Sequence, residues 1–402
     1  MENVPDVIIV GGGPVGSFAA LKLAKLGANV TVFEEHTAIG SPSHCAGHLS
    51  IRSLRNLGLY PLPGKIVENT FSKANFYSPR GFKFSVHLAR PVTCAVNREA
   101  FDKYIADEAE AAGARYLLNS RVQSLLMENG VVKGVEVKQR FPAKIVVDAE
   151  GISSRILRQT GLSGLNGERL VYAVEAEVAN VKDVELNAVE VFLGKAYAPG
   201  FYAWLIPRLD GTAKVGLATK TGNPKEFLQR LMLKHPVASQ QLAKAKITRI
   251  AFHPITLGGP ISRTYSHGFL AVGDVASQVK PTTGGGVIFG LTCAGIAADV
   301  AHEAIRRNDV SANFLRLYQK RCEDTLKFDF NVMLRIRRFL DALSDEKVDE
   351  VLRFCARIGL DKTLENVEEI DLQGQALLKI FTKPAMFAAL VYFFKLYLSA
   401  NP

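Results

Sequence analysis

Apolar and polar positions follow three different patterns along the chain. Residues 6–10 form a β-branched run typical of a buried parallel strand, residues 15–26 repeat apolar side chains at helical spacing, and residues 29–33 form a second buried run. Gly27 supplies the C-cap of the helix between the two strands. The N-terminal residues therefore predict a βαβ unit.

The same unit is predicted to continue and then to resume late in the chain. Its further elements are a helix at 98–112, short strands at 122–126, 131–137 and 144–147, a buried strand at 269–272 and a helix from 287 onward.

The middle of the chain alternates apolar and polar residues, which predicts an antiparallel sheet. Its strands are expected at 171–178, 189–193, 201–206 and 212–218. A hairpin at 71–77 and 83–87, joined by a turn at 78–81, is expected to add to that sheet. From about residue 310 the pattern is helical, so the chain predicts two or three structural units.

The net charge of the chain indicates the sign of its binding partners but does not identify one class of them. The net charge is +10 and the sequence pI about 9.3, which favours anionic partners such as phosphorylated substrates or acidic lipids. Nucleic acid is not expected, because the basic residues are spread along the chain and are not interleaved with aromatics.

Targeting and metal signals are weak. No spanning run of about 18 apolar residues and no basic signal sequence are found, so we expect a cytoplasmic protein. The five cysteines are an odd number and show no CxxC spacing, so neither a zinc site nor a secreted disulfide framework is indicated. A single bridge, such as Cys293 with Cys322, is left open.

The loop after the first strand carries a dinucleotide fingerprint, GGGPVG at residues 11–16. Gly11 permits a tight turn, Gly13 lets the backbone approach a pyrophosphate, and Gly16 lets helix and strand pack closely. Pro14 begins the helix. Glu34, at the end of the next strand, is placed to accept a ribose hydroxyl, which favours FAD or NAD over NADP. Glu35 is the less favoured acceptor.

A second glycine segment favours FAD over NAD, because two such sites imply one long cofactor. Asp274 follows the strand at 269–272 and is expected to accept ribityl hydroxyls. The amides of Gly284, Gly285 and Gly286, after Pro281 and before Val287, lie at a helix start, where they stabilise negative charge on a reduced flavin.

Residues 198–207 read APGFYAWLIP and contain the only tryptophan. Tyr202 and Trp204, between Pro199 and Pro207, predict a rigid aromatic wall for an apolar substrate. The alternative is that the two rings are ordinary strand residues, one of which fills the core.

These motifs carry a family resemblance. The glycine loop with Glu34, the segment RxxFD from Arg98, the Gly273-Asp274 pair and residues 281–286 resemble the glutathione-reductase-type FAD fold of the p-hydroxybenzoate hydroxylase group. Within it, PxxYxWxIP at 199–207 resembles the PxxYxWxFP motif of the geranylgeranyl reductase family. SPSHC at 41–45 also resembles that family, in which a cysteine lies beside the flavin and the substrate cavity.

The chain departs from the family pattern at three positions. Ile206 replaces phenylalanine, Ala46 replaces a common glycine, and Glu150 stands where aspartate usually precedes glycine. The first two concern substrate fit, and the third leaves the role of Glu150 open.

The resemblance implies an α/β fold with three parts. They are a discontinuous FAD-binding Rossmann domain at 1–70, 93–168 and 262–310, an inserted antiparallel β-sheet substrate domain at 71–92 and 169–261, and a helical region at 311–402.

The resemblance also implies a reaction and further contacts. Reduced FAD would saturate C=C bonds of geranylgeranyl chains, as in archaeal-type ether phospholipids, by hydride transfer from N5 to a double bond held against Tyr202 and Trp204. Ferredoxin, a reduced flavin and NAD(P)H stay open as electron donors, and so does the oligomeric state. Cofactor contacts are further expected at Cys45, Ala46, Arg98 and Val122.

Cys45 lies between His44 and His48, so it is a candidate proton donor, although a free cysteine is often a small buried apolar residue. Arg98 is expected to contact the flavin or its phosphates, with an exposed arginine as the alternative.

Residues 385–398 form an aromatic-rich apolar segment near Lys379, Lys383 and Lys395. Two interpretations stay open, docking on a membrane surface and packing on the other domains.

Three rival functions remain at this point. They are an aromatic-ring monooxygenase of the same fold, an electron-transfer flavoprotein dehydrogenase that passes electrons to quinone, and a lipid carrier without catalytic activity. The electron-transfer class usually carries an iron–sulphur domain, and no cluster-spaced cysteines occur here.

Overall fold

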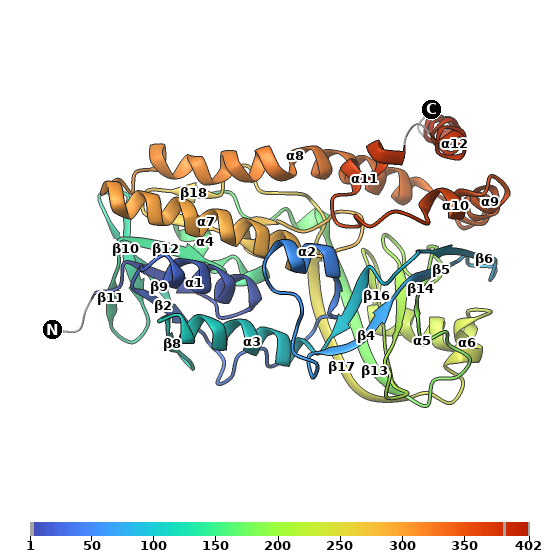
Figure 1. The fold of residues 1–402 in the computed structure, drawn as a ribbon, viewed down its shortest axis with the longest axis horizontal. Helices are drawn as coiled ribbons and strands as arrows, with labels where there is room; N and C mark the ends of the chain where they lie inside the picture. Colours follow the sequence, from blue (N-terminus) through green and yellow to red (C-terminus); the bar gives the residue numbers. More distant parts are fainter. Residues whose placement is uncertain (1–3, 381–382, 401–402) are drawn as a thin grey trace. The chain divides into compact units, whose positions relative to one another are not determined.

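The computed structural model describes residues 4–380 and 383–400, except for the side chains of 394, 395 and 397–400. The chain divides into two compact units. Unit 1 comprises residues 4–43, 98–169 and 256–330, and unit 2 comprises residues 44–97, 170–255 and 331–400 without 381–382. Figure 1 shows the elements of both.

A six-stranded sheet forms the centre of unit 1, with the order β18-β19-β12-β1-β2-β8. All neighbouring strands are parallel except the edge strand β18, which is antiparallel to β19. Its strands are β1 (Val7–Val10), β2 (Val30–Phe33), β8 (Arg115–Leu117), β12 (Ile145–Asp148), β18 (Tyr265–Ser266) and β19 (Phe269–Ala271). The buried β-branched runs become central parallel strands, as predicted.

Helices and a small sheet complete unit 1. Helices α1 (Pro14–Lys25), α3 (Arg98–Ala111) and α7 (Val287–Arg307) pack together, with α1 in contact with both others. The remaining elements are the three-stranded sheet of β9 (Ser124–Glu128), β10 (Val131–Glu136) and β11 (Arg140–Pro142), the short helix α4 (Arg155–Gln159) and single 3-10 turns at Gly151–Ser153, Gly167–Arg169 and Gly273–Ala276.

Helix α7 is, among the described residues, the one helix long and apolar enough to cross a membrane. Most of it is buried, however, and it packs on α1. Both properties are those of a core helix in a globular unit.

Unit 2 is built on a seven-stranded sheet with the order β17-β13-β16-β15-β14-β5-β6. Its strands are β5 (Lys73–Tyr77), β6 (Lys83–His87), β13 (Leu170–Ala179), β14 (Ala188–Phe192), β15 (Ala203–Pro207), β16 (Ala213–Thr219) and β17 (Lys246–Thr256). The predicted hairpin at 71–87 does join this sheet. The pairing of β5 with β14 is nevertheless parallel, so the sheet is mixed and not purely antiparallel. No hairpin connects these two strands, and their relative direction is therefore free.

The two faces of the seven-stranded sheet pack on different layers. One face packs on α5 (Pro224–Lys234) and α6 (Ala238–Gln241) around Leu205, Val215 and Leu217. The other face, through Val189 and Ile206, packs on the three-stranded sheet of β3 (His48–Ser50), β7 (Thr93–Val96) and β4 (Val67–Phe71), followed in sequence by α2 (Ile51–Asn56).

The C-terminal helices continue both units. Helix α8 (Ala312–Ala342) begins in unit 1 and ends in unit 2. Helices α9 (Asp345–Arg357), α10 (Leu360–Leu364), α11 (Gln373–Ile380) and α12 (Pro384–Ala400) follow in unit 2. Met386 of α12 is buried in a cluster with Phe84 and Val86 of β6, while Phe387 and Val391 are exposed.

The unit bounds differ from the predicted domains. Residues 44–70 and 93–97 belong to unit 2, where β3 and β4 each pair with β7. The helical residues 311–402 form no third unit in the described part of the chain and divide between the other two near residue 330.

Candidate functional site

The glycine loop of unit 1 makes its turn through the backbone. Gly11 adopts φ +101°, a backbone conformation that residues with a side chain rarely adopt. A Cβ at Gly16 would fall on the carbonyl oxygen of Gly11, so strand β1 and helix α1 approach as closely as glycine allows. By contrast, nothing lies within 4 Å of a Cβ built on Gly13. Space is therefore open in front of the one glycine expected to face a pyrophosphate.

Glu34 closes this loop from the end of β2. Its Oε2 accepts the Gly12 N–H at 2.7 Å, and its Oε1 lies 2.6 Å from Nδ1 of His36. The carboxylate therefore braces the fingerprint loop, a role that the motif alone did not predict. A ribose contact by Glu34 stays a prediction.

The second glycine segment lies at the start of α7, where Gly286 is the N-cap and no side chain caps the helix. A Cβ at Gly286 would meet Oδ1 of Asp274 at 2.6 Å, so glycine is needed for the helix end to approach this carboxyl. Burial raises the pKa of Asp274, and the charge of Arg98 opposes this shift. Pro281, Gly284 with φ +69° and Gly285 form the preceding turn, and Val287 begins the helix.

Arg98, the first residue of α3, forms a bidentate ion pair with Asp102 at 3.0 and 2.9 Å. Both side chains are nearly buried. The alternative of an exposed surface arginine is therefore wrong. Burial raises the pKa of Asp102 above its usual value, and the neighbouring guanidinium of Arg98 opposes part of this shift. Contact between Arg98 and a flavin stays a prediction.

Other predicted or conspicuous positions of unit 1 have structural partners. Glu35 is exposed and pairs with Arg121 at 3.1 Å, so it belongs to the solvated surface. Val122 is buried in the core. Glu150, whose role the sequence left open, accepts hydrogen bonds from the N–H groups of Ile156 and Leu157 and so holds the start of α4.

These features fit FAD on structural grounds. Helices α1 and α7 have Gly13 and Gly286 as N-caps and no side-chain cap, which leaves backbone N–H groups at two positive dipole ends. Gly13 is open and Gly286 admits close approach to Asp274. The residues that would hold the cofactor are therefore those of the two glycine segments with Asp274. When bound and reduced, FAD supplies a hydride.

The predicted aromatic wall lies on one face of the unit 2 sheet. Tyr202 precedes β15 and Trp204 lies within it, with the ring centroids 5.9 Å apart in an edge-to-face arrangement. Both side chains are partly exposed, whereas Ala203 between them and Leu205 after Trp204 are fully buried on the opposite face. Trp204 also packs against the buried cluster of Phe71, Ala95, Val189 and Ile206, so the alternative in which one of the two rings contributes to the core stays open. Pro199 and Pro207 flank this segment.

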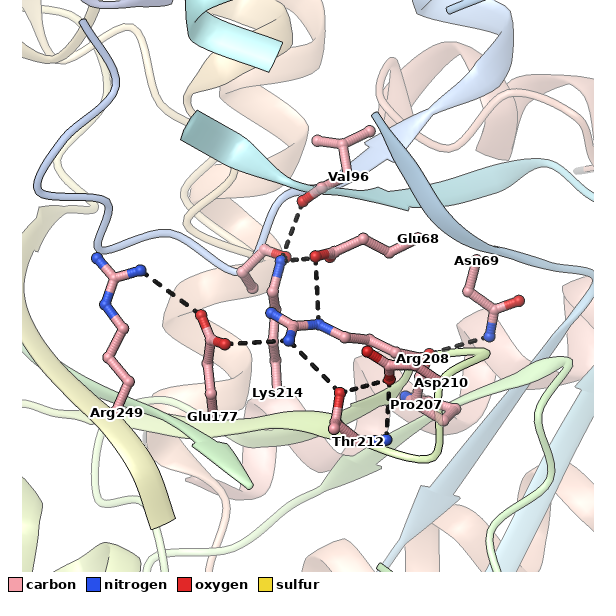
Figure 2. Close-up of polar contacts among 11 residues, drawn as sticks. Glu68, Asn69, Val96, Glu177, Pro207, Arg208, Asp210, Thr212, Lys214 and Arg249 are labelled. Carbon is pink, nitrogen blue, oxygen red and sulfur yellow. Dashed lines mark hydrogen bonds and ion pairs between the residues drawn. The ribbon is translucent and has the colours of Figure 1, made fainter. Parts of the chain in front are cut away.

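The same face carries a cluster of charges that sequence reasoning missed. Figure 2 shows Lys214 of β16 directed at Glu68, with Nζ 2.7 Å from its Oε2. Arg208 lies between Glu68 and Glu177, at 3.3 and 3.0 Å. The sequence shows only that Glu175 and Glu177 share one face of a predicted strand, and it contains no signal that places Lys214 or Glu68 beside them.

Lys214 also ties the cysteine segment to the sheet. Its Nζ donates to the carbonyl oxygens of Ala46 and Val96, at 3.1 and 3.0 Å. Ala46 packs on the cluster that includes Ile206 and Trp204. The residue after Cys45 is therefore held against the aromatic face, although its predicted contact with a flavin stays untested.

Cys45 itself is half-buried with a free thiol. Of its two neighbouring histidines, His44 stacks on His253 with centroids 3.8 Å apart, and His48 bonds Oγ1 of Thr93 at 2.7 Å. All five cysteines are free, and no bridge joins Cys293 to Cys322, although the two thiols lie within hydrogen-bonding reach.

Comparisons with known proteins identify the family. The FAD binding domain family model matches residues 5–292. Digeranylgeranylglycerophospholipid reductase 2 of Methanopyrus kandleri is 33% identical over 383 residues, which cover 92% of this chain and 96% of that protein. The chain belongs to the geranylgeranyl reductase family of FAD-dependent oxidoreductases.

Further members and neighbours place this reductase family in a wider fold. The digeranylgeranylglycerophospholipid reductase of Methanocaldococcus jannaschii is 31% identical over 96% of this chain and 97% of its own length. A geranylgeranyl bacteriochlorophyll reductase-like protein of Thermoplasma acidophilum superposes with a TM-score of 0.87 at 26% identity, covering 97% of this chain and 99% of that one. A flavin-dependent brominase, 20% identical over 87% of this chain and 93% of its own with a TM-score of 0.70, shares the fold alone. The predicted fold class and the FAD cofactor of this reductase family member are thus confirmed.

Proposed function

We propose that this protein is an FAD-dependent reductase that saturates C=C bonds in the geranylgeranyl chains of archaeal-type ether phospholipids. The observation that carries the proposal is the pair of edge-to-face rings, Tyr202 and Trp204, which are partly exposed on one face of the sheet while Ala203 and Leu205 are buried on the other. Isolated alkenes are poor hydride acceptors, so catalysis depends on holding the double bond in one position and excluding water. Flat aromatic faces meet both needs without offering a polar competitor.

The basic balance of the chain supports a lipid with an anionic headgroup. The net charge of +10 raises the local concentration of phosphorylated ligands at low ionic strength. The named relatives act on digeranylgeranylglycerophospholipids, which combine such a headgroup with prenyl chains.

The test is an anaerobic incubation of geranylgeranylated phospholipid with the dithionite-reduced protein, followed by mass spectrometry. We expect successive gains of two hydrogens. Replacement of Trp204 by Leu should reduce the rate at least tenfold, whereas Tyr172→Leu, at an exposed aromatic position on β13 of the same sheet, should not. Gain of one oxygen in air, or flavin oxidation by quinone without alkene reduction, would overturn the proposal in favour of a monooxygenase or an electron-transfer dehydrogenase.

We propose Cys45 as the proton donor that complements the hydride. Its thiol is free and half-buried, and the residue after it is fixed by Lys214 on the aromatic face. Removal of a general acid typically lowers turnover by 10² to 10⁴-fold. Cys45→Ser should therefore bind FAD normally and reduce the lipid at least 100-fold more slowly. Unchanged turnover would remove Cys45 from the mechanism.

We further propose that the protein is cytoplasmic and contacts the membrane surface through α12. One side of this helix packs on unit 2 through Met386, while Phe387 and Val391 are exposed near Lys383. Exposed aromatics beside cations are typical of interfacial helices. The side chain of Lys395 lies outside the described residues. Sedimentation with anionic vesicles should decrease when Phe387 and Val391 are both replaced by Ser, and binding that does not change would contradict this contact.

The electron donor is proposed more broadly, as ferredoxin, a reduced flavin or NAD(P)H. Comparison of the anaerobic rates of flavin reduction by each donor assigns it directly.

A further inference from the structure

Glu175, Gly216 and Trp204 form a row across three strands of the unit 2 sheet. Glu175 of β13 is opposite Gly216 of β16, and Gly216 is opposite Trp204 of β15. Residues in register on adjacent strands present their side chains to the same face. The carboxyl and the indole are therefore separated by one position that has no side chain.

The missing side chain at Gly216 is what lets the indole lie across β16. A Cβ at this position would meet Cζ2 of Trp204 at 2.5 Å and Cε2 at 2.7 Å. Cε2 is the ring atom bonded to Nε1, so the N–H edge of the indole crosses Gly216. The next strand in that direction is β13, which carries Glu175.

Trp204 and Glu175 each have a buried polar atom that lacks a well-formed hydrogen bond. Nε1 of Trp204 and Oε2 of Glu175 are both buried, and neither makes a fully formed hydrogen bond with the described residues. The indole is nevertheless near enough to lower the pKa of Glu175. Buried polar groups in folded proteins are nearly always paired, so this donor and this acceptor are natural partners.

The surrounding charges leave Glu175 free to act on the indole. Burial raises the pKa of Glu175 to about 7, the charge of Glu177 adds to this, and Lys214 and Arg208 oppose it. The two cations are already engaged, Lys214 by Glu68 and Arg208 by Glu68 and Glu177, while Arg249 of β17 pairs with Glu177. No ion pair of Glu175 is found in the described part of the chain.

We propose that Glu175 is a positioning residue for the aromatic wall, whose carboxylate accepts the indole N–H and fixes the ring plane of Trp204, and whose protonation releases it. A charged acceptor holds an N–H more tightly and with narrower geometry than a neutral one. The importance of a fixed ring for alkene reduction rests on the proposed function; the link between Glu175 and Trp204 does not.

The link can be measured without cofactor or substrate, because Trp204 is the only tryptophan of the chain. Indole emission of the FAD-free protein should titrate in one step with a midpoint near pH 7. Glu175→Gln should abolish the step. Glu190→Gln is the matched control, because Glu190 is a buried carboxyl of the same sheet that accepts a hydrogen bond from Gln241. Glu190 lies on β14 in register with Leu205 of β15, so its side chain is on the face opposite Trp204. That variant should keep the titration.

Turnover supplies the second readout. Glu175→Leu removes the acceptor and should lower kcat about tenfold while KM changes less than twofold, the size expected for one hydrogen bond to a charged group. In the wild type kcat should rise with pH through the same midpoint, and in Glu175→Gln that rise should disappear. If Glu175→Leu fails to fold, the fluorescence of Glu175→Gln still decides.

The possible failures are distinct. An emission titration that persists in Glu175→Gln overturns the role of Glu175, whatever the reaction. A wild-type protein whose emission titrates as expected but which reduces no prenyl lipid overturns the proposed function and leaves the Glu175–Trp204 link intact.

Discussion

The two glycine segments of unit 1 and the aromatic face of unit 2 are built in opposite ways. Unit 1 presents backbone, with two uncapped helix starts and glycines at positions that admit no side chain or leave space open. Unit 2 presents side chains, with two aromatic rings beside a buried cluster of three carboxylates and two cations. A cofactor site made of backbone leaves a short fixed pattern in the sequence, whereas a face made by cross-strand neighbours leaves none.

Asp148 of unit 1 and Lys214 of unit 2 illustrate two ways of burying a titratable group. In unit 1, Asp148 is fully buried with Oδ2 unpaired in the described structure, and burial raises its pKa well above the usual value. In unit 2 Lys214 instead meets the opposite charge of Glu68. The electrostatic cost of burial is therefore avoided by neutralisation at Asp148 and by pairing at Lys214.

The largest expected effect comes from removal of a cation in unit 2. Lys214→Met leaves Glu68 buried beside Arg208 alone and frees the carbonyls of Ala46 and Val96. Loss of one partner from a buried pair should lower the free energy of unfolding by about 4 kcal/mol, measured by urea denaturation. Lys347→Met, which removes an exposed ion pair with Glu350, should leave the free energy of unfolding nearly unchanged, because solvent screens such pairs. Equal effects of both variants would show that the cluster does not stabilise the fold.

The second prediction concerns pH and again involves unit 2. Burial raises the pKa of Glu175 from 4.5 to about 7 and lowers that of His235 from 6.5 to about 4. The raised pKa of Glu175 adds to the free energy of unfolding fully below pH 4.5, and this contribution is lost as the pH rises to 7. The lowered pKa of His235 adds to it fully above pH 6.5, and that contribution is lost as the pH falls to 4. Each amounts to roughly 3 kcal/mol, and they oppose each other.

Separate substitutions of Glu175 and His235 should reveal these two opposing pH dependences of the free energy of unfolding. On acidification from pH 7 to 4.5, Glu175→Gln should lose stability relative to wild type and His235→Gln should gain it, in urea titrations at several pH values. Parallel pH dependences of the two variants would contradict the assignment.

The third prediction tests the backbone character of the cofactor site. No atom of the chain lies within 4 Å of a Cβ at Gly13, so Gly13→Val should leave the unfolding temperature of the FAD-free protein nearly unchanged. The added side chain would occupy the space expected for the pyrophosphate and should weaken FAD binding about 100-fold, or about 2.7 kcal/mol, by calorimetry. Gly167→Val, at an equally open position of unit 1, should bind FAD normally. Normal binding by Gly13→Val would place the pyrophosphate elsewhere.

The smallest effect is expected at a departure from the family motif. Ile206 is buried against Phe71, Ala95 and Val189, so its side chain belongs to packing and not to the partly exposed wall. Ile206→Val should cost about 1 kcal/mol in urea denaturation and change turnover less than twofold. A larger loss of turnover than of stability would assign Ile206 to the substrate.

The sequence predicted the elements whose signals are local. The βαβ unit, the hairpin at 71–87 and the placement of Tyr202 and Trp204 on one face follow from periodicity and turn residues within a few positions. Strand β17, with the sequence KITRIAFHPIT, was missed although it spans 11 residues. It is an edge strand with intermediate burial, and its apolar residues do not form a distinct buried pattern.

The charged cluster and the unit bounds could not be predicted for a different reason. Glu68, Glu177 and Lys214 meet only after β13 has paired with β16 and the sheet that contains β4 has packed on them. Residues 44–70 follow the fingerprint domain in sequence, yet their strands pair with β7 of unit 2. The bracing of the glycine loop by Glu34 likewise depends on a backbone turn that no side-chain pattern reveals.

The parallel pairing of β5 with β14 has a consequence for biosynthesis. Strand β5 leaves the ribosome roughly 100 residues before its partner, a delay of about ten seconds at ordinary elongation speeds. During that interval the hairpin of β5 and β6 has an open edge, at which nascent chains are prone to associate with one another. Slower translation between residues 88 and 187 should therefore increase the fraction of newly made protein that depends on chaperones for solubility.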